Sequence, residues 1–368
     1  MTATSTTFDP AVYGITPGAA GDIAATPPGG QHQTDIAVIG AGPVGLFSVF
    51  EAGMLKLKAH VIDALPHIGG QCSAMYPEKP IYDIPAWPKI EAQALIDQLA
   101  GQAAPFDPVW HLGQQVVSMA RDTDTGDWLV GTDKATQIRA KAVLIGAGVG
   151  AFGPNRPPLT GIEDYEERSV FYRVARKEAF RGKRVVIAGG GDSALDWAIE
   201  LADIAAAIMV IHRRPKFRGA PESVAKLHAL AAQGKIELVV PYQLHGLEGD
   251  PAAGRLDVVT VADLDGNVRR LDADILLPFF GLSMNLGPIL EWGLALDQHH
   301  ITAEPTTMAT SLPGVFAIGD IARYPHKLKL ILSGFAEAAS AVHAAREICR
   351  PGEVMHFEYS TTKGVPGA

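Results

Sequence analysis

A glycine-punctuated turn occurs twice in the chain, each time between a short apolar run and a helical stretch. The first copy is DIAVIGAGPVG, from Asp35 to Gly45, and the second is VVIAGGGDSALD, from Val185 to Asp196. β-Branched residues before the turn indicate a strand, and the apolar spacing after it indicates a helix. Strand, glycine turn and helix in this order begin a dinucleotide-binding unit. Two copies therefore predict two such units in one chain.

The first copy carries the features that a dinucleotide needs. Gly40 permits the tight turn, Gly42 lets backbone amides approach a pyrophosphate, and Gly45 lets the helix pack close to the strand. The N-terminus of the helix adds positive potential. The next apolar run ends in Asp63, whose carboxylate can accept hydrogen bonds from a ribose. The contacts predicted here are Gly40, Gly42, Pro43, Gly45 and Asp63.

The second copy ends differently. Gly189, Gly191 and Ala194 repeat the small-residue spacing, but the position equivalent to Asp63 is followed by basic residues. Guanidinium groups pair bidentately with phosphate, whereas an acid here would reject the 2′-phosphate of NADP. The alternative is that these arginines are solvated side chains at a strand end. The predicted NADP contacts are Gly189, Gly191, Asp192, Ser193, His212, Arg213, Arg214 and Arg218.

One acidic and one basic copy imply two different dinucleotides, and FAD with NADPH is the natural pair. The length of 368 residues, of which 47% are hydrophobic, is enough for two cores and so for two domains. The net charge of −9 argues against nucleic acid as a partner. With only Cys72 and Cys349, the chain has no disulfide framework and no cysteine cluster for zinc or iron and sulfur, which fits a reducing, cytoplasmic setting.

The N-terminal segment is rich in Thr, Ala, Pro and Gly. It lacks the basic start and the apolar run of a signal peptide, and it has no span long enough to cross a membrane. We predict a disordered tail over residues 1–34, with a docking arm for a partner as the alternative.

Several strings resemble known flavoproteins. The two glycine turns, HRRPKFR and LPGVFAIGDIA are similar to those of the two-dinucleotide-binding flavoproteins. Within that group the chain resembles the thioredoxin-reductase-like ferredoxin (flavodoxin)–NADP reductase family, through GGQCSAMYPEKPIYDIPAWPKI, AGGGDSALDW, LSGFAEA and the terminal YSTT. The resemblance runs from about residue 35 to residue 362. Pro215 departs from it, because an acidic residue is usual there, and Gly219 after Arg218 also departs.

The resemblance implies an α/β fold of the thioredoxin reductase type, with two Rossmann-like domains of three layers (ββα/αβα). Gly146 and Gly148 precede a proline-rich stretch that we interpret as the exit from the first domain, and FFGLSMNLGP near Gly281 is interpreted as the return. The predicted FAD domain is therefore discontinuous, comprising residues 35–156 and 284–368. An NADP domain over residues 157–283 is inserted in it.

The resemblance also assigns residues around the flavin. Tyr76 and Tyr359 correspond to aromatic residues that stack on the two faces of the flavin ring, although either can instead be a core residue. Asp320 corresponds to the acid that contacts the ribityl or pyrophosphate part of FAD. The helix after Leu332 is expected to aim its N-terminal amides at the flavin, with simple packing as the alternative. Further predicted FAD contacts are Gly70, Gln71 and Thr361.

The resemblance implies that hydride passes from NADPH to FAD and that single electrons then pass to ferredoxin or flavodoxin, in a homodimer. This chemistry needs no acid and base pair and no metal, only a nicotinamide carbon within ~3–3.5 Å of the flavin's reactive nitrogen. A dithiol relay is excluded, because Pro77 replaces the second cysteine near Cys72, and GDSALD carries none. The alternatives are an NADPH-dependent flavin monooxygenase or oxidase, and a non-enzymatic NADP-responsive flavoprotein.

Overall fold

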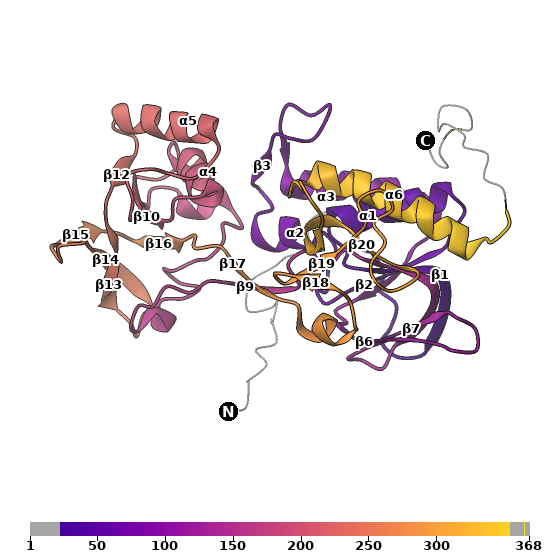
Figure 1. The fold of residues 1–368 in the computed structure, drawn as a ribbon. Helices are drawn as coiled ribbons and strands as arrows, with labels where there is room; N and C mark the ends of the chain where they lie inside the picture. Colours follow the sequence, from indigo (N-terminus) through magenta and orange to yellow (C-terminus); the bar gives the residue numbers. More distant parts are fainter. Residues whose placement is uncertain (1–22, 354–363, 365–368) are drawn as a thin grey trace. The chain divides into compact units, whose positions relative to one another are not determined.

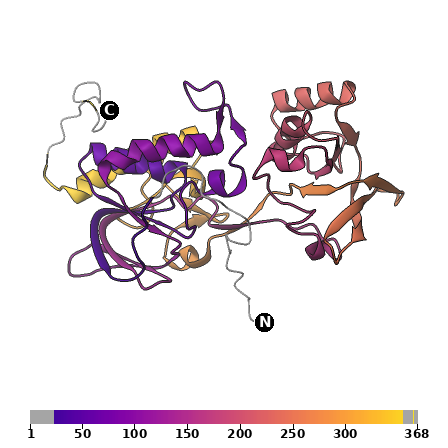
Figure 2. The same cartoon turned by 180° about the vertical axis from the view of Figure 1, so that it is seen from behind.

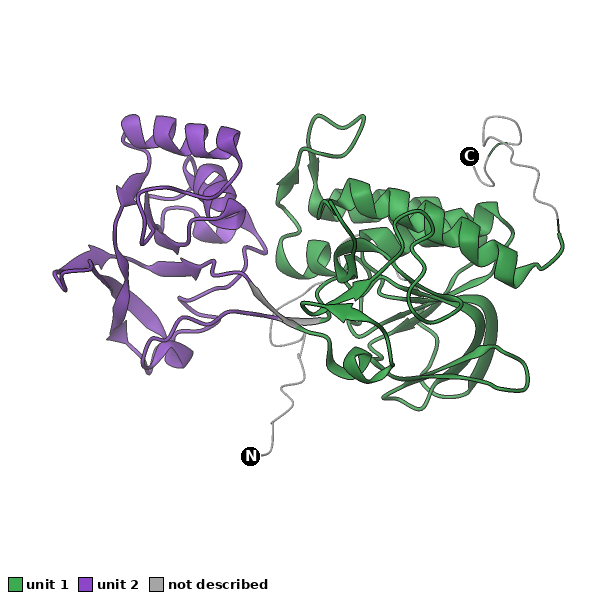
Figure 3. Cartoon of the chain, in the orientation of Figure 1, with its two compact units in different colours: residues 1–152, 284–368 green, residues 153–283 purple. Residues whose placement is uncertain are grey.

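The computed structural model describes residues 23–353 and residue 364, with only the backbone described at residues 151–152 and 282–284. The chain divides into two compact units, which Figure 3 shows in green and purple. Unit 1 comprises residues 1–152 and 284–368, and unit 2 comprises residues 153–283. Residues 157–283, predicted for the inserted domain, fall in unit 2, whose first residue lies four positions earlier.

Unit 1 contains four α-helices among the described residues (Figure 1). They are α1 (Pro43–Met54), α2 (Gln71–Met75), α3 (Ala92–Ala103) and α6 (Ile331–Cys349), with 3-10 turns η2 (Ala104–Phe106), η5 (Gly287–Glu291) and η6 (Gly319–Ile321). The strands are β1 (Gln31–Ile39), β2 (Ala59–Asp63), β3 (Pro80–Ile81), β4 (Ile90–Glu91), β5 (Val109–Leu112), β6 (Val116–Arg121), β7 (Trp128–Thr132), β8 (Gln137–Ile145), β18 (Leu296–Asp297), β19 (His300–Thr302), β20 (Val315–Ala317) and β21 (Ala322–Arg323).

The main sheet of unit 1 has the strand order β5-β2-β1-β8-β7-β6, and β20 also pairs with β8. Strands β5, β2, β1, β8 and β20 are parallel to their neighbours, whereas β7 and β6 continue from β8 as an antiparallel meander. Ile36 and Val38 pack with α1, α3 and α6 on one face of the sheet, and Ala37 and Ile39 pack with the meander on the other. Figures 1 and 2 show these two layers from opposite sides.

Unit 2 repeats the parallel arrangement on a smaller scale. Its strands are β10 (Arg184–Ala188), β11 (Ala207–Ile211), β12 (Glu237–Val239), β13 (Gln243–Asp250), β14 (Arg255–Ala262), β15 (Val268–Asp272) and β16 (Ile275–Pro278), and its helices are α4 (Asp192–Leu201) and α5 (Pro221–Ala232), with 3-10 turns η3 (Ile162–Asp164) and η4 (Lys177–Phe180). A parallel sheet β12-β11-β10-β16 packs against an antiparallel sheet β13-β14-β15. Strands β9 (Ala151–Pro154) and β17 (Leu282–Asn285) pair where the chain passes between the units.

The predicted tail is too long by several residues. Strand β1 begins at Gln31, and residues 31–34 pair in register with residues 137–140 of β8. Before it, the amide of Thr26 donates to the carbonyl of Trp110 at 2.7 Å. The backbone of residues 31–34 is therefore satisfied by β8, a partner more than a hundred residues away that the local composition does not reveal.

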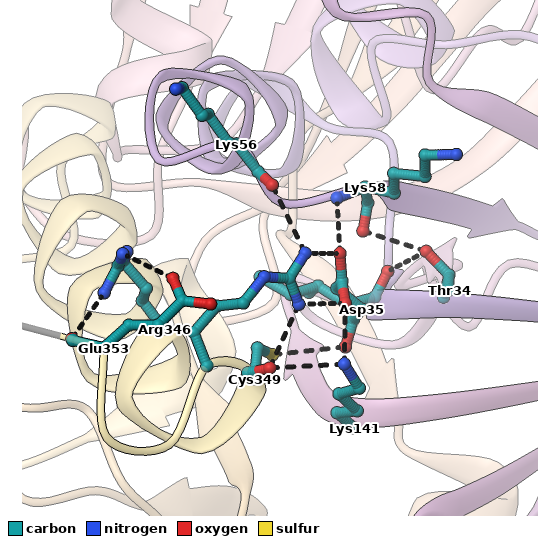
Figure 4. A network of polar contacts seen from close by, with 10 residues as sticks. Thr34, Asp35, Lys56, Lys58, Lys141, Arg346, Cys349 and Glu353 are labelled. Carbon is teal, nitrogen blue, oxygen red and sulfur yellow. Dashed lines mark hydrogen bonds and ion pairs between the residues drawn. The ribbon is translucent and has the colours of Figure 1, made fainter.

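Asp35 connects the start of β1 to the end of α6 (Figure 4). Its carboxylate accepts hydrogen bonds from both terminal nitrogens of Arg350, at 2.7 and 2.9 Å, from the Lys58 amide at 3.0 Å and from the Lys141 ammonium at 3.2 Å. Burial alone would raise the pKa of Asp35, but these donors outweigh it and lower the pKa to about 2. One carboxylate thus joins both parts of the discontinuous unit 1.

Candidate functional site

The first glycine turn lies at the carboxyl end of β1, and two of its glycines are required by the fold. Gly40 has a φ of 110°, and a Cβ there would collide with the carbonyl oxygen of Gly146 at the end of β8. A Cβ at Gly45 would collide with the carbonyl oxygen of Gly40. Gly42 is different, because a Cβ there would meet no heavy atom of the protein within 4 Å. Only Gly42 faces open space.

This open position is the N-cap of α1. Gly42 has an extended backbone, no side chain caps the helix, and Pro43 follows as its first residue. No acidic residue lies in the first turn, so the first amides of α1 are left for an anion. The turn therefore offers a pyrophosphate both space and hydrogen-bond donors.

Asp63 lies at the end of β2, beside this turn. Its carboxylate accepts hydrogen bonds from the Ala41 amide at 2.6 Å and from the Leu65 amide at 2.8 Å. Burial raises the pKa of Asp63, while the two amides act in the opposite direction. Each carboxylate oxygen retains a second lone pair. The Asp63 side chain can therefore bind the turn and also accept a hydrogen bond from a ribose hydroxyl.

Gly70 and Gln71 approach the same turn from the segment before α2. The Gly69 amide donates to the Ala41 carbonyl at 2.8 Å, and a Cβ on Gly70 would lie 3.2 Å from the Cα of Gly42. The Gln71 side chain reaches the loop after β8, because its Nε2 would lie 3.6 Å from a Cβ on Gly148. Of these two predicted FAD contacts, Gly70 therefore lies beside the open position at Gly42, and Gln71 lies beside Gly148.

The predicted contact Asp320 comes from a third segment, η6. A Cβ on Gly319 would lie 3.5 Å from a methyl carbon of Val44 in α1, and a Cβ on Gly334 in α6 would collide with the same side chain. The N-terminal turns of α1 and α6 thus meet η6 at Val44. Helix α6 has no side-chain cap at Leu330 and no acid in its first turn, so its first amides are also left for an anion.

A buried ion pair fixes η6, and the sequence analysis missed it. Glu337 is only 3% exposed, and it accepts hydrogen bonds from the Gly319 amide and the Tyr324 hydroxyl, both at 2.7 Å, and pairs with Lys327. The Lys327 side chain is buried as well. The sequence feature that could have indicated this pair is the acid in LSGFAEA, because it stands between small and apolar residues. Glu337 holds the backbone next to Asp320 and is a positioning residue.

Tyr76 ends α2 and is half-buried against the core of unit 1. Its hydroxyl lies close enough to the thiol of Cys72 for each group to affect the pKa of the other. Burial raises the pKa of Cys72 to about 12, and the Asp320 carboxylate contributes in the same direction. Tyr76, Cys72 and Asp320 are therefore neighbours at this site. Tyr359 and Thr361, the other predicted flavin contacts, lie outside the described residues.

The second glycine turn follows β10 and repeats the pattern of the first. A Cβ on Gly189 would lie 2.7 Å from the carbonyl oxygen of Phe279, after the neighbouring strand β16, and 3.0 Å from the Cβ of Ala194. Gly191 is the N-cap of α4 and again faces open space, with no heavy atom within 4 Å of a Cβ. No side chain caps α4, and Asp192 and Ser193 are exposed in its first turn. Gly191 is the counterpart of Gly42.

The basic residues lie beside this second turn. The Arg218 amide donates to the Gly190 carbonyl at 2.7 Å, and the Ala220 amide donates to the Asp192 carboxylate at 2.7 Å. The loop from β11 to α5 is thereby held over the N-terminus of α4. Arg213, Arg214 and Arg218 are exposed, and no carboxylate of the described residues forms an ion pair with them.

His212 is the predicted NADP contact that the structure buries. Its ring stacks on Phe217 with a centroid distance of 5.4 Å, and a Cβ on Gly190 would collide with it. Burial and the nearby Arg218 lower the pKa of His212, so the ring is neutral near pH 7. The structure gives His212 a packing contact with the glycine turn, and the arginines carry the exposed positive charge.

Comparison with known proteins identifies the class. Residues 34–347 match the family model described as pyridine nucleotide-disulphide oxidoreductase, and the chain belongs to this family. The fold resembles a thioredoxin reductase of Lactococcus lactis, with a TM-score of 0.73 at 21% identity over 86% of this chain and 99% of that one. The fold also resembles a thioredoxin reductase of T. acidophilum, with a TM-score of 0.73 at 22% identity over 85% of this chain and 98% of that one. The predicted fold class is confirmed.

Two curated relatives are more similar in sequence. The ferredoxin–NADP reductase of Paramagnetospirillum magneticum is 59% identical over 336 residues, covering 91% of this chain and 99% of that protein. The ferredoxin–NADP reductase of Acidiphilium cryptum is 61% identical over 335 residues, covering 91% and 98%. The resemblance to a reductase family of this type, stated from the sequence motifs, is thereby confirmed.

Proposed function

We propose that this protein is a ferredoxin–NADP reductase that holds FAD in unit 1 and NADPH in unit 2. The observation that carries the proposal is the pair of open N-cap glycines, Gly42 and Gly191, each at an uncapped helix start. One lies beside the acid Asp63, and the other lies beside three arginines that form no ion pair with any described carboxylate. The names of the relatives with about 60% identity supply the electron acceptor.

The residues of unit 1 fit FAD. The α1 amides and Gly42 receive the pyrophosphate, and Asp63 accepts from the adenosine ribose. Asp320 is assigned to the central part of the cofactor, and the hydrogen bond from the adjacent Gly319 amide to Glu337 supports this assignment. Tyr76 covers one face of the flavin ring, and Tyr359 is assigned to the other face. When bound, FAD supplies the exchange between a two-electron donor and a one-electron acceptor.

The residues of unit 2 fit NADPH. The amides of α4 receive the pyrophosphate at Gly191, with Asp192 and Ser193 at the edge of the turn. Arg213, Arg214 and Arg218 bind the 2′-phosphate, which distinguishes NADPH from NADH. They have no carboxylate partner among the described residues, so binding a phosphate breaks no ion pair.

The thiols argue against a dithiol pathway of the kind found in disulfide reductases. Burial raises the pKa of both Cys72 and Cys349 to about 12, so neither is a thiolate near neutral pH. Cys349 lies at the end of α6, where its thiol donates to the Asp35 carbonyl. We therefore assign the exit of electrons to a direct transfer to a carrier protein.

Several finer assignments belong to the same proposal. Flavodoxin is a second acceptor, the working form is a homodimer, and the site of action is the cytoplasm. The absence of cysteine pairing agrees with a reducing compartment. Among the helices formed by the described residues, none has both the length and the apolar character needed to cross a bilayer.

The test is steady-state reduction of purified ferredoxin and flavodoxin by NADPH, with thioredoxin and oxidised glutathione as parallel acceptors. We expect rapid reduction of ferredoxin and background rates with both disulfide acceptors. Measuring oxygen consumption in the same reactions examines the monooxygenase or oxidase alternative. Rapid NADPH oxidation coupled to oxygen but not to ferredoxin would overturn the proposal. Absence of flavin reduction by NADPH would instead favour a non-enzymatic NADP-responsive protein.

A further inference from the structure

Three histidines meet in unit 1, away from the glycine turn. His32 lies near the start of β1, His60 is in β2 and His111 is in β5, and one ring nitrogen of each lies within 4.8 Å of the others. The closest pair is His60 Nδ1 and His111 Nε2, at 3.0 Å. The ring centroids of His32 and His111 are 4.8 Å apart. Three separate strands thus bring imidazoles to one point.

The sheet topology explains this meeting. β2 and β5 are adjacent parallel strands, and Ala37 of β1 faces His60 in register. β1 pairs with β2 only from Ile36 onward, whereas residues 31–34 pair with β8 alone. His32 faces Ile138 of β8 in register, and Ile138 packs in the same cluster as the meander residues, so His32 lies on the face of the sheet that the meander covers.

The two inner rings lie in the core of unit 1, where both His60 and His111 are buried. A neutral imidazole offers a metal the lone pair of one ring nitrogen. His111 is completely buried, and its Nδ1 has no hydrogen-bond partner among the described residues. The nitrogen of His111 available to an ion is Nε2, which faces His60 Nδ1 at 3.0 Å.

The outer ring has a backbone partner of the kind that metal-binding histidines use. His32 Nε2 lies 3.3 Å from the carbonyl oxygen of Gly29. A hydrogen bond donated to a carbonyl fixes the tautomer and leaves Nδ1 as the lone-pair nitrogen. His32 is half-buried, so its ring has more freedom to move than the rings of His60 and His111.

We infer that His32, His60 and His111 form a binding site for one divalent transition metal ion of the Zn²⁺ type. Imidazole is a preferred ligand of Zn²⁺, Cu²⁺ and Ni²⁺, and three histidines leave a fourth position for water. Two nitrogens bound at about 2.0–2.1 Å in tetrahedral geometry are about 3.3 Å apart. The His60 and His111 pair is already near that separation. His32 closes the remaining gap by a small rotation at the start of β1.

The site is structural, because its ligands lie on the sheet and none of them belongs to either glycine turn. An ion would join the first residues of β1 to β2 and β5, beyond the point where β1 pairs with β2. Its presence is independent of the proposed function, since neither dinucleotide nor electron acceptor takes part.

The test is equilibrium dialysis of the full chain, without a histidine tag and after treatment with EDTA, against Zn²⁺ near pH 7. We expect one Zn²⁺ per chain with a dissociation constant below about 10 µM, and an increase in the melting temperature when the ion is added. His111→Ala should weaken binding at least tenfold. His245→Ala, at an exposed position in unit 2, is the matched control and should bind as the wild type does.

Because His111 is buried, its replacement by alanine can also disturb the fold. His32→Ala is therefore the second variant, and far-UV circular dichroism of both variants shows whether they are folded. His32→Ala should keep the wild-type spectrum and also lose affinity at least tenfold. A dissociation constant above about 10 µM for the wild type would overturn the inference. Equal affinity in wild type, His32→Ala and His245→Ala would also overturn it, because the ion would then be bound elsewhere among the twelve histidines.

Discussion

Replacing Gly42 by alanine tests whether this glycine is needed for FAD binding and not for folding. The new Cβ meets no heavy atom of the protein within 4 Å, and the φ of −71° is one that alanine adopts without strain. Alanine reduces the entropy of the unfolded chain but is a poorer N-cap than glycine, and these effects oppose each other. The free energy of unfolding of the FAD-free protein should therefore change by less than about 1 kcal/mol.

The effect on FAD should be much larger. The methyl group would occupy the space through which the pyrophosphate reaches the first amides of α1. Losing one hydrogen bond to a charged group costs about 1.5–3 kcal/mol. The dissociation constant of FAD should therefore rise about 10- to 150-fold. FAD fluorescence quenching, titrated into FAD-free protein, measures this constant, and urea unfolding measures the stability.

Two matched variants complete the experiment. Gly191→Ala makes the equivalent change in unit 2, where a Cβ also meets nothing, and it should leave FAD binding unchanged while weakening NADPH. Gly45→Ala places a Cβ on the Gly40 carbonyl oxygen and should prevent normal folding. If folded Gly42→Ala bound FAD within threefold of the wild type, the pyrophosphate would lie elsewhere and the assignment of this turn would be refuted.

Four further predictions concern other parts of the molecule. Arg213→Ala should reduce the kinetic preference for NADPH over NADH about 10- to 100-fold, and equal losses with both nucleotides would contradict a role at the 2′-phosphate. Asp35→Asn should lower the free energy of unfolding at pH 7 by about 1–2 kcal/mol. Because the folded-state pKa of Asp35 is lowered from 3.8 to about 2, that difference should persist above about pH 4 and shrink as the pH falls toward 2; a constant difference would refute this. Both thiols should resist DTNB at pH 8 in the native protein and react in denaturant, and a fast native reaction would contradict their raised pKa. Glu337→Gln should destabilise the protein by about 3–5 kcal/mol by leaving Lys327 buried without its partner, whereas the exposed control Glu347→Gln should change little.

The glycine turns could be predicted because their constraints are local. Both follow a buried strand and precede a helix, as the spacing predicted, and Gly45 allows close packing as expected. The sequence could not reveal the partner strand at each turn. The carbonyls of Gly146 and Phe279 exclude a Cβ at Gly40 and Gly189, and both lie far along the chain. Local spacing therefore predicted the turns, while the sheet order determines which glycines the fold requires.

The end of the N-terminal tail was predicted wrongly for a related reason. Residues 31–34 are polar enough to resemble a tail, but strand pairing with β8 satisfies their backbone. Asp35 then joins β1 to Lys141 and Arg350, which are 106 and 315 positions away. These partners lie too far along the chain to be seen in the local sequence. Local composition therefore led us to predict a disordered tail where the structure has a strand.

The buried charged and imidazole groups show why side-chain sites are harder to predict than the fold. Glu337 and Lys327 are ten residues apart, yet their pairing depends on η6, which brings the Gly319 amide to the same carboxylate. His32, His60 and His111 have no metal-binding spacing, because each comes from a different strand. Neighbouring parallel strands are joined by long crossover connections, so residues that lie side by side on them are far apart in the sequence. The positions of the side chains in such polar clusters are therefore set by the order of the strands in the sheet. The residues next to them in the sequence do not determine those positions.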